Sequence, residues 1–203
     1  MSRRALLVSV MFLSFGVVAI AAQLTLPELA KVRGPAPVSI SRTRELAPSS
    51  FEEIVAKADL IVHGRAVATK SYLSDDQMHL YTDYVITPVR VLVQRTVQSA
   101  TVPGSPTQII FKQFGGEMTI QGVKVFDQDD ELPLLQSGAE VLLVLVYDQT
   151  DGKYRLTGDI TGAFAVNGSQ IAPLLRPPVK YERFNGMSLV QFTSEVGRLR
   201  PDR

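Results

Sequence analysis

Residues 59–93 read DLIVHGRAVATKSYLSDDQMHLYTDYVITPVRVLV, two β-rich runs on either side of a polar turn. The first run, from Asp59 to Thr69, carries Gly64 in its middle, and a glycine inside a strand often marks a bulge or a sharp bend. In the second run, from Leu80 to Val93, alternate valines share one face. Pro88 has no N–H for a sheet, so a bulge or an edge position is expected there. The stretch predicts two long, bent strands.

Shorter strands follow on the C-terminal side. They are expected at residues 108–114, in a hairpin over residues 118–126, and at residues 140–147 (EVLLVLVY), the most apolar segment beyond the N-terminal region and the candidate central strand. Asp151-Gly152 and Asn167-Gly168 are hairpin-turn signals. Ser49 or Ser50 can cap a short helix at about residues 50–57, and Ser188 can cap a closing helix at about residues 188–199.

These elements define the expected fold class. The chain is predicted to be mainly β, a small closed or partly open OB-like β-barrel with a short N-terminal helix and a C-terminal helix. Residues 49–203 would form this single domain. Residues 22–48 contain Pro27, Pro35, Pro37 and Pro48 without sustained periodicity, and are predicted to be a linker or an extended arm.

The N-terminus indicates export. Arg3 and Arg4 precede an uncharged apolar run, and Ala19-Ile20-Ala21 supplies the small residues of a cleavage site. Residues 1–21 are therefore predicted to be a signal peptide, which places the protein in the periplasm or outside the cell. The alternative is an uncleaved membrane anchor, since about 18 apolar residues can just span a bilayer. After cleavage no membrane span is expected.

Composition excludes several classes of function. The chain has 203 residues with 21 basic and 20 acidic side chains, and loss of Arg3 and Arg4 leaves 19 basic and 20 acidic. Overall charge therefore supports neither a nucleic acid nor an anionic membrane as partner. Charge runs at residues 115–159 (acidic) and 176–203 (basic) are expected to be solvated surfaces. The absence of cysteine excludes thiol catalysis and thiolate metal sites.

The strand pattern resembles the netrin-like domains, whose best-known members are the tissue inhibitors of metalloproteinases. Ala58–Val67 is similar to their opening strand, and Tyr81–Tyr84 with Val89–Leu92 to their second strand. Glu140–Val146 followed by Asp151-Gly152-Lys153 is similar to the hairpin that precedes barrel closure. The resemblance covers about residues 58–166 and implies a five-stranded OB-type barrel with flanking helices. The family's disulfides, and the N-terminal cysteine with which the inhibitors chelate zinc, have no counterpart here.

Two histidines are candidates for chemistry. His63 in the first strand and His79 before the second would face each other in some pairings, with Asp75 or Asp76 as a third metal ligand. The alternative is an outward-facing strand histidine and a loop histidine. No Gly-x-Ser-x-Gly elbow is present, which argues against a serine hydrolase.

A run of carboxylates is the other candidate metal site. Asp127, Asp129, Asp130 and Glu131 could supply oxygens to calcium, although EF-hand spacing is absent. The alternative is a solvated acidic loop.

The functional expectation is an exported, non-enzymatic binding module for a protein or an envelope component, without a cofactor. The first alternative is a metal-dependent enzyme or hydrolase that uses His63, His79 and nearby carboxylates. The second is a structural or assembly protein that acts through its N-terminal arm.

Overall fold

The computed structural model describes residues 24–42, 50–95, 109–157, 162–175 and 182–200. The predicted signal peptide lies outside the described residues. The helices are α2 (Leu26–Arg33), α3 (Phe51–Lys57), the 3-10 helix η1 (Glu182–Phe184) and α4 (Leu189–Leu199). The strands are β1 (Val38–Arg42), β2 (Leu60–Leu73), β3 (Leu80–Gln94), β4 (Ile109–Phe114), β5 (Gly116–Ile120), β6 (Val123–Asp129), β7 (Glu140–Asp148), β8 (Lys153–Leu156), β9 (Ala163–Asn167), β10 (Gln170–Pro173) and β11 (Met187–Ser188).

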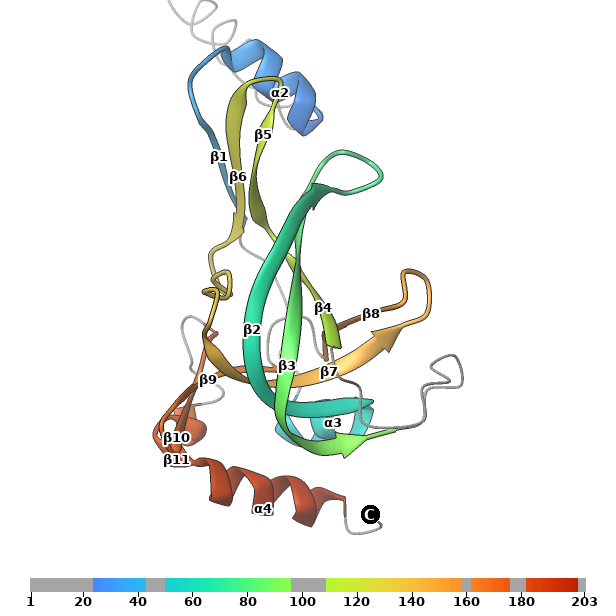
Figure 1. The fold of residues 1–203 in the computed structure, drawn as a ribbon, viewed down its shortest axis with the longest axis vertical. Coiled ribbons are helices and arrows are strands. Elements are labelled where there is room, and N and C mark those ends of the chain that lie inside the picture. The colour runs from blue at the N-terminus through green and yellow to red at the C-terminus, as the bar shows by residue number, and fades with distance from the viewer. Residues whose placement is uncertain (1–23, 43–49, 96–108, 158–161, 176–181, 201–203) are drawn as a thin grey trace, which may run out of the picture.

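In the described part of the chain the main sheet has eight strands in the order β11-β10-β9-β7-β2-β3-β4-β8, and β8 also pairs with β7. The sheet is therefore ring-like and partly curled (Figure 1). The step from β4 to β8 is a single parallel residue pair, Phe111 with Tyr154, whereas β7 and β8 pair over four residues. The predicted mainly-β class, with a short helix before the long strands and another at the C-terminal side, is confirmed.

One bend of the long hairpin lies where the sequence predicted it, at Gly64 opposite Pro88. The register between β2 and β3 shifts at three points, one of them between His63 and Gly64, and Gly64 pairs with Pro88. A Cβ atom at Gly64 would lie only 2.7 Å from the carbonyl oxygen of Thr87. Glycine is required here because the two backbones approach too closely for any side chain.

Strand β7 separates two cores. Leu142 and Val144 belong to a cluster covered by α3 and α4, whereas Val141, Leu143 and Leu145 belong to a cluster inside the curled sheet. Both faces of β7 are thus buried, as a central strand requires. The helices are capped as expected, by Ser50 with Glu53 and by Ser188 with Gln191.

The proline-rich segment differs from the prediction of a linker or arm. Residues 26–33 form α2, which begins with a capping box between Thr25 and Glu28, and residues 38–42 form β1. Strand β1 pairs in parallel with β6, and the three-stranded sheet β1-β6-β5 extends the molecule at the end away from α4 (Figure 1). The prediction failed for two reasons. Helix α2 has barely two turns, too few to show a helical periodicity, and β1 pairs with residues more than eighty positions away, which the local sequence does not indicate. No described helix is long and apolar enough to cross a membrane.

Candidate binding face

The two histidines do not meet. His63 lies on β2 opposite Arg90 of β3, whereas His79 lies in the turn just before β3 begins. The two histidines are therefore about ten residues apart along β3, which corresponds to roughly 30 Å at about 3.3 Å per residue. No described residues form a group of three or more potential metal ligands. The metal site built from both histidines and Asp75 or Asp76 is therefore not assembled in the described part of the chain.

Each histidine has a local partner instead. The Nε2 atom of His63 lies 2.6 Å from Oε1 of Glu140 on β7. His63 lies on the same side of the sheet as Arg65 and Arg90, but it is only 6% exposed and is therefore not open to solvent. The ring of His79 packs on Phe114 with centroids 5.3 Å apart. The carboxylate of Asp76 accepts hydrogen bonds from Ser74 and from the backbone N–H of Met78, and so shapes the β2–β3 turn.

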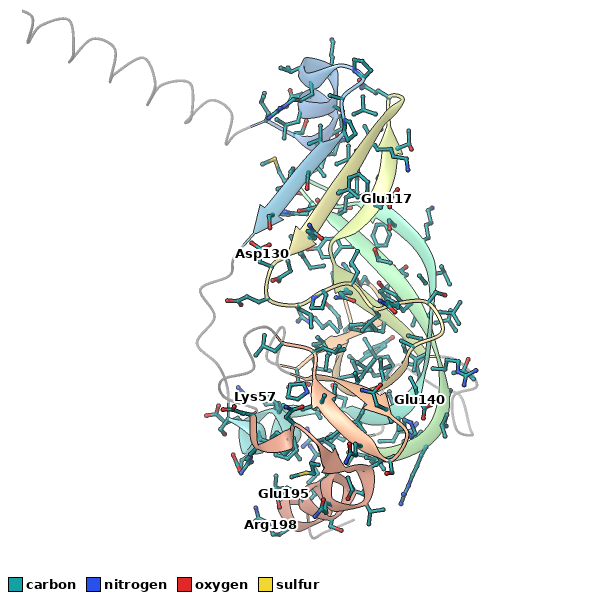
Figure 2. All side chains as sticks on the ribbon, turned by 90° about the vertical axis from the view of Figure 1, so that its left-hand side faces the viewer. Lys57, Glu117, Asp130, Glu140, Glu195 and Arg198 are labelled. Atoms are coloured by element: carbon teal, nitrogen blue, oxygen red, sulfur yellow. The ribbon has the colours of Figure 1, made fainter. Side chains whose placement is uncertain are left out.

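The acidic run is largely structural. Asp127 and Asp129 are buried in β6, which contradicts a fully solvated loop. Asp127 accepts a hydrogen bond from the N–H of Leu80 at 2.9 Å, and Asp129 accepts one from the N–H of Glu131 at 2.9 Å. Asp130 is exposed at the end of β6, well away from Glu140 (Figure 2). Asp127 and Asp129 thus satisfy backbone donors, whereas Asp130 accepts a hydrogen bond from the Ser41 hydroxyl.

The sheet itself presents a different candidate. The outward residues of β2, β3 and β4 pair across the strands in successive rows, because directly paired residues share a face. We call this surface the outer face. Its rows are Tyr72–Tyr81–Phe114, Lys70–Asp83–Lys112, Val67–Val85–Ile110, Arg65–Thr87 and His63–Arg90.

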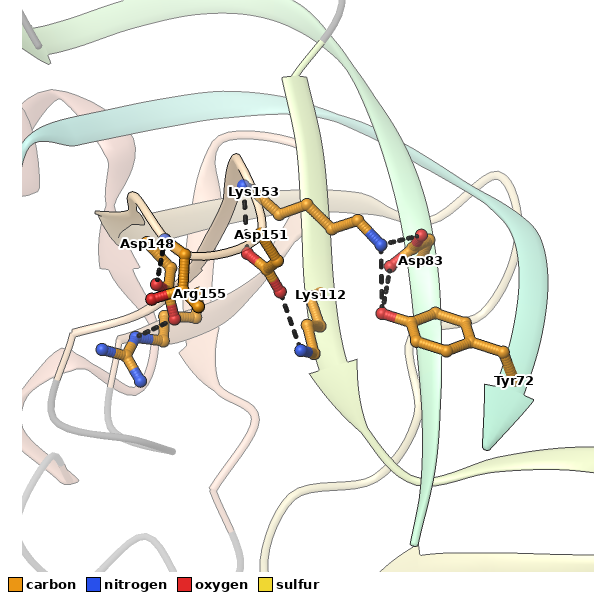
Figure 3. Close-up of polar contacts among 8 residues, drawn as sticks. Tyr72, Asp83, Lys112, Asp148, Asp151, Lys153 and Arg155 are labelled. Carbon is orange, nitrogen blue, oxygen red and sulfur yellow. Dashed lines mark hydrogen bonds and ion pairs between the residues drawn. The ribbon is translucent and has the colours of Figure 1, made fainter. Parts of the chain in front are cut away.

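The aromatic and charged rows meet the β7–β8 hairpin (Figure 3). The Nζ atom of Lys153 donates to Asp83 at 2.7 Å and to the Tyr72 hydroxyl at 3.1 Å, and Tyr72 donates to Asp83 at 3.1 Å. Lys112 donates to Asp151 at 2.7 Å. The Nζ atom of Lys112 also lies over the Tyr81 ring, 4.4 Å from its centroid, and the Nζ atom of Lys153 lies over the Tyr72 ring, 4.6 Å from its centroid. These contacts fasten the hairpin to the sheet where only one backbone pair joins β4 and β8.

The environment holds the two lysines and Tyr72 in their ordinary protonation states. Burial by itself would lower the pKa of Lys153, but the hydrogen bonds to Asp83 and Tyr72 outweigh it and the pKa is raised. The pKa of Lys112 is raised in the same way, chiefly by Asp151 acting against burial. Burial raises the pKa of the Tyr72 phenol, and Asp83 adds to this effect. At neutral pH the two lysines are therefore ammonium groups and Tyr72 is a neutral phenol.

A small cavity of about 160 Å³ opens beside this cluster. It is bounded by side chains of β3, β4, the end of β6, the segment after β6 and the β7–β8 hairpin, among them Tyr81, Gln113, Asp129, Leu132 and Arg155. The cavity lies where β4 diverges from β8. It is too small for a drug-sized ligand, whose pockets measure about 300 Å³ or more.

The apolar row of the outer face is largely open to solvent. Val67 is 43% exposed and Ile110 is 44% exposed, with Val85 half-buried between them. Val89, the residue bulged out beside Pro88, is 66% exposed. Helices α3 and α4 cover the neighbouring core around Ile61, but leave these side chains in solvent.

Sequence analysis did not find this face. The alternation of Arg65 with Val67, and of Asp83 with Val85, was visible, but the alternation alone does not tell which strands lie side by side or in which register. The comparisons add no relative: no protein-family model matches the chain, and no curated protein matches it.

Proposed function

We propose that this protein is an exported, non-enzymatic binding module on an OB-like barrel, and that it holds a protein or another envelope component against its outer face. The observation that carries the proposal is the row Val67–Val85–Ile110, a band of aliphatic side chains across three adjacent strands in which Val67 and Ile110 are exposed and Val85 is half-buried. Exposed apolar patches with a polar rim are characteristic of interaction sites. The aromatic row and the paired charges beside it supply such a rim.

The order and pairing of the strands support the OB-like assignment. Strands β2, β3 and β4 form an antiparallel meander, β7 returns antiparallel to β2, and β8 pairs antiparallel with β7 and parallel with β4. A five-stranded, partly open Greek-key barrel has connections of this kind. In OB folds the ligand face lies on the second and third strands beside two particular loops. The corresponding elements here are β3 and β4, with the β2–β3 and β7–β8 turns, and they border the outer face.

The alternatives have less support. The enzyme reading needed His63 and His79 together, and the pairing of β2 with β3 places them at opposite ends of the hairpin. The assembly reading needed a free arm, whereas α2 and β1 bury Leu26, Ala30 and Val38 in a core with β5 and β6. Deleting residues 22–48 would therefore uncover this core rather than remove an independent arm.

The proposal is tested by the double variant Val67→Ser/Ile110→Ser. In chemical cross-linking and affinity capture from the exported fraction, followed by measurement of affinity for the captured component, the variant is expected to bind about tenfold more weakly or worse. Removing the apolar contact of two side chains costs at least about 1.4 kcal/mol, which corresponds to that factor. The matched control is Val190→Ser, because Val190 is 72% exposed on α4, away from the outer face. Equal binding by both variants, or loss with the control alone, would contradict the proposal.

Export is tested separately. Cleavage after Ala21 predicts that the mature protein begins at Ala22 and is recovered from the exported fraction without Met1. Intact-mass spectrometry of that fraction reads the N-terminus directly. Recovery in the membrane with residues 1–21 retained would support the anchored alternative instead.

A further inference from the structure

We infer that the partner is a protein that presents an amphipathic acidic segment, with apolar side chains for the row Val67–Val85–Ile110 and carboxylates for the cations around it. This inference rests on the proposed function, because it names the chemistry of the partner on the same outer face.

The first argument is charge. Arg65, Lys70 and Arg90 are exposed on the outer face, and none of them forms an ion pair with any residue that the structure describes. Lys112 and Lys153, by contrast, are held by Asp151 and Asp83. Counting Glu140, which lies opposite Arg65 on β7, the surface has five cations and three carboxylates. The excess of positive charge is local to this face, since residues 22–203 have slightly more acidic than basic side chains.

The second argument is composition. Tyrosine, phenylalanine and arginine around an aliphatic centre are the residues enriched in protein–protein interfaces. The three cations without an ion pair among the described residues lie on both sides of the apolar row, with Lys70 one row toward the aromatic rings and Arg65 and Arg90 toward the opposite end. A helical segment with an apolar stripe flanked by glutamate or aspartate matches this arrangement of apolar centre and cationic rim.

Other occupants fit less well. A second copy of the chain would bring like charges together on this face, which costs free energy. A bilayer is anchored by Trp, Phe or Leu side chains, and here the exposed groups are short and β-branched. A nucleic acid needs free ring faces for stacking, but Lys112 and Lys153 lie over Tyr81 and Tyr72. An added β-strand needs a free edge, whereas β3 pairs with both β2 and β4.

The experiment uses a defined probe and the mature chain. The probe is a fluorescein-labelled helical peptide with leucines on one face and glutamates on the others, and its counterpart carries lysine at each glutamate position. Fluorescence anisotropy is expected to show binding of the acidic peptide that weakens as salt is raised, and no binding of the basic one. The triple variant Arg65→Glu/Lys70→Glu/Arg90→Glu is expected to lose at least about tenfold in affinity, because three favourable rim contacts become repulsive.

The matched control is Lys31→Glu/Arg33→Glu/Lys57→Glu, which changes the net charge equally at exposed positions on α2 and α3. Circular dichroism checks that both triple variants fold. Equal binding of the two peptides, equal loss in both triple variants, no binding of the acidic peptide, or binding only to phosphatidylglycerol vesicles would each overturn the inference.

Its failure differs from failure of the proposed function. If Val67→Ser/Ile110→Ser abolishes capture of the natural partner while the Arg65 triple variant retains it, the outer face is the binding site. In that case the inference that the partner is acidic is wrong. If neither set of substitutions weakens capture, the face is not the binding site.

Discussion

Replacing Phe192 with alanine is expected to lower the free energy of unfolding by about 3–5 kcal/mol, the usual cost of removing a buried phenylalanine. The Phe192 ring is fully buried beneath α4 and lies 5.3 Å, centroid to centroid, from both Phe51 and Phe164. These rings come from α3, β9 and α4, so the substitution loosens both helices from the sheet at once. Urea denaturation followed by far-ultraviolet circular dichroism measures the loss.

The control for this variant is Val190→Ala on the same helix. Val190 is exposed, so its truncation is expected to change stability by no more than about 0.5 kcal/mol. A Phe192→Ala protein that unfolds within about 1 kcal/mol of the wild type would mean that α4 does not close this core.

Replacing Leu143 with alanine is expected to cost about 2–5 kcal/mol. Leu143 is fully buried inside the curled sheet, among residues of β2, β3 and β4, and β7 is paired there with both β2 and β9. The surrounding strands are held by ladder hydrogen bonds and cannot collapse fully into the space left by the leucine. Denaturant unfolding is again the measurement.

Val32→Ala provides an aliphatic control, because Val32 is exposed on α2. If Leu143→Ala were no more destabilising than this control, the interior of the curled sheet would not be a packed core. The OB-like assignment would then lose its physical basis.

Stability and binding are expected to separate in this molecule. Strands β2 and β7 contribute residues to both cores, whereas the proposed contact residues are solvent-facing neighbours of core residues on β2, β3 and β4. Substitutions on the outer face should therefore change affinity with little effect on unfolding.

Local patterns alone determined much of the fold. The long hairpin, its bend at Gly64 opposite Pro88 and the capped helices α3 and α4 were all predicted, because each depends on residues close together in sequence. The hairpin turns after β7 and β9 were predicted in place but not in detail, since the first spans residues 149–152 and the second is Gly168-Ser169 rather than Asn167-Gly168. The burial of β7 could also be predicted from the sequence, since an unbroken apolar run is typical of a strand covered on both faces.

Tertiary structure alone decided the rest. The pairing of β1 with β6, the separation of His63 from His79 and the burial of Asp127 depend on contacts between distant segments. The same is true of the outer face, where strand register aligns Val67 with Val85 and Ile110 and leaves Arg65 without an ion pair among the described residues. A shift of one residue would have turned these side chains to the opposite face, and the alternation within one strand carries no information about its neighbour's register.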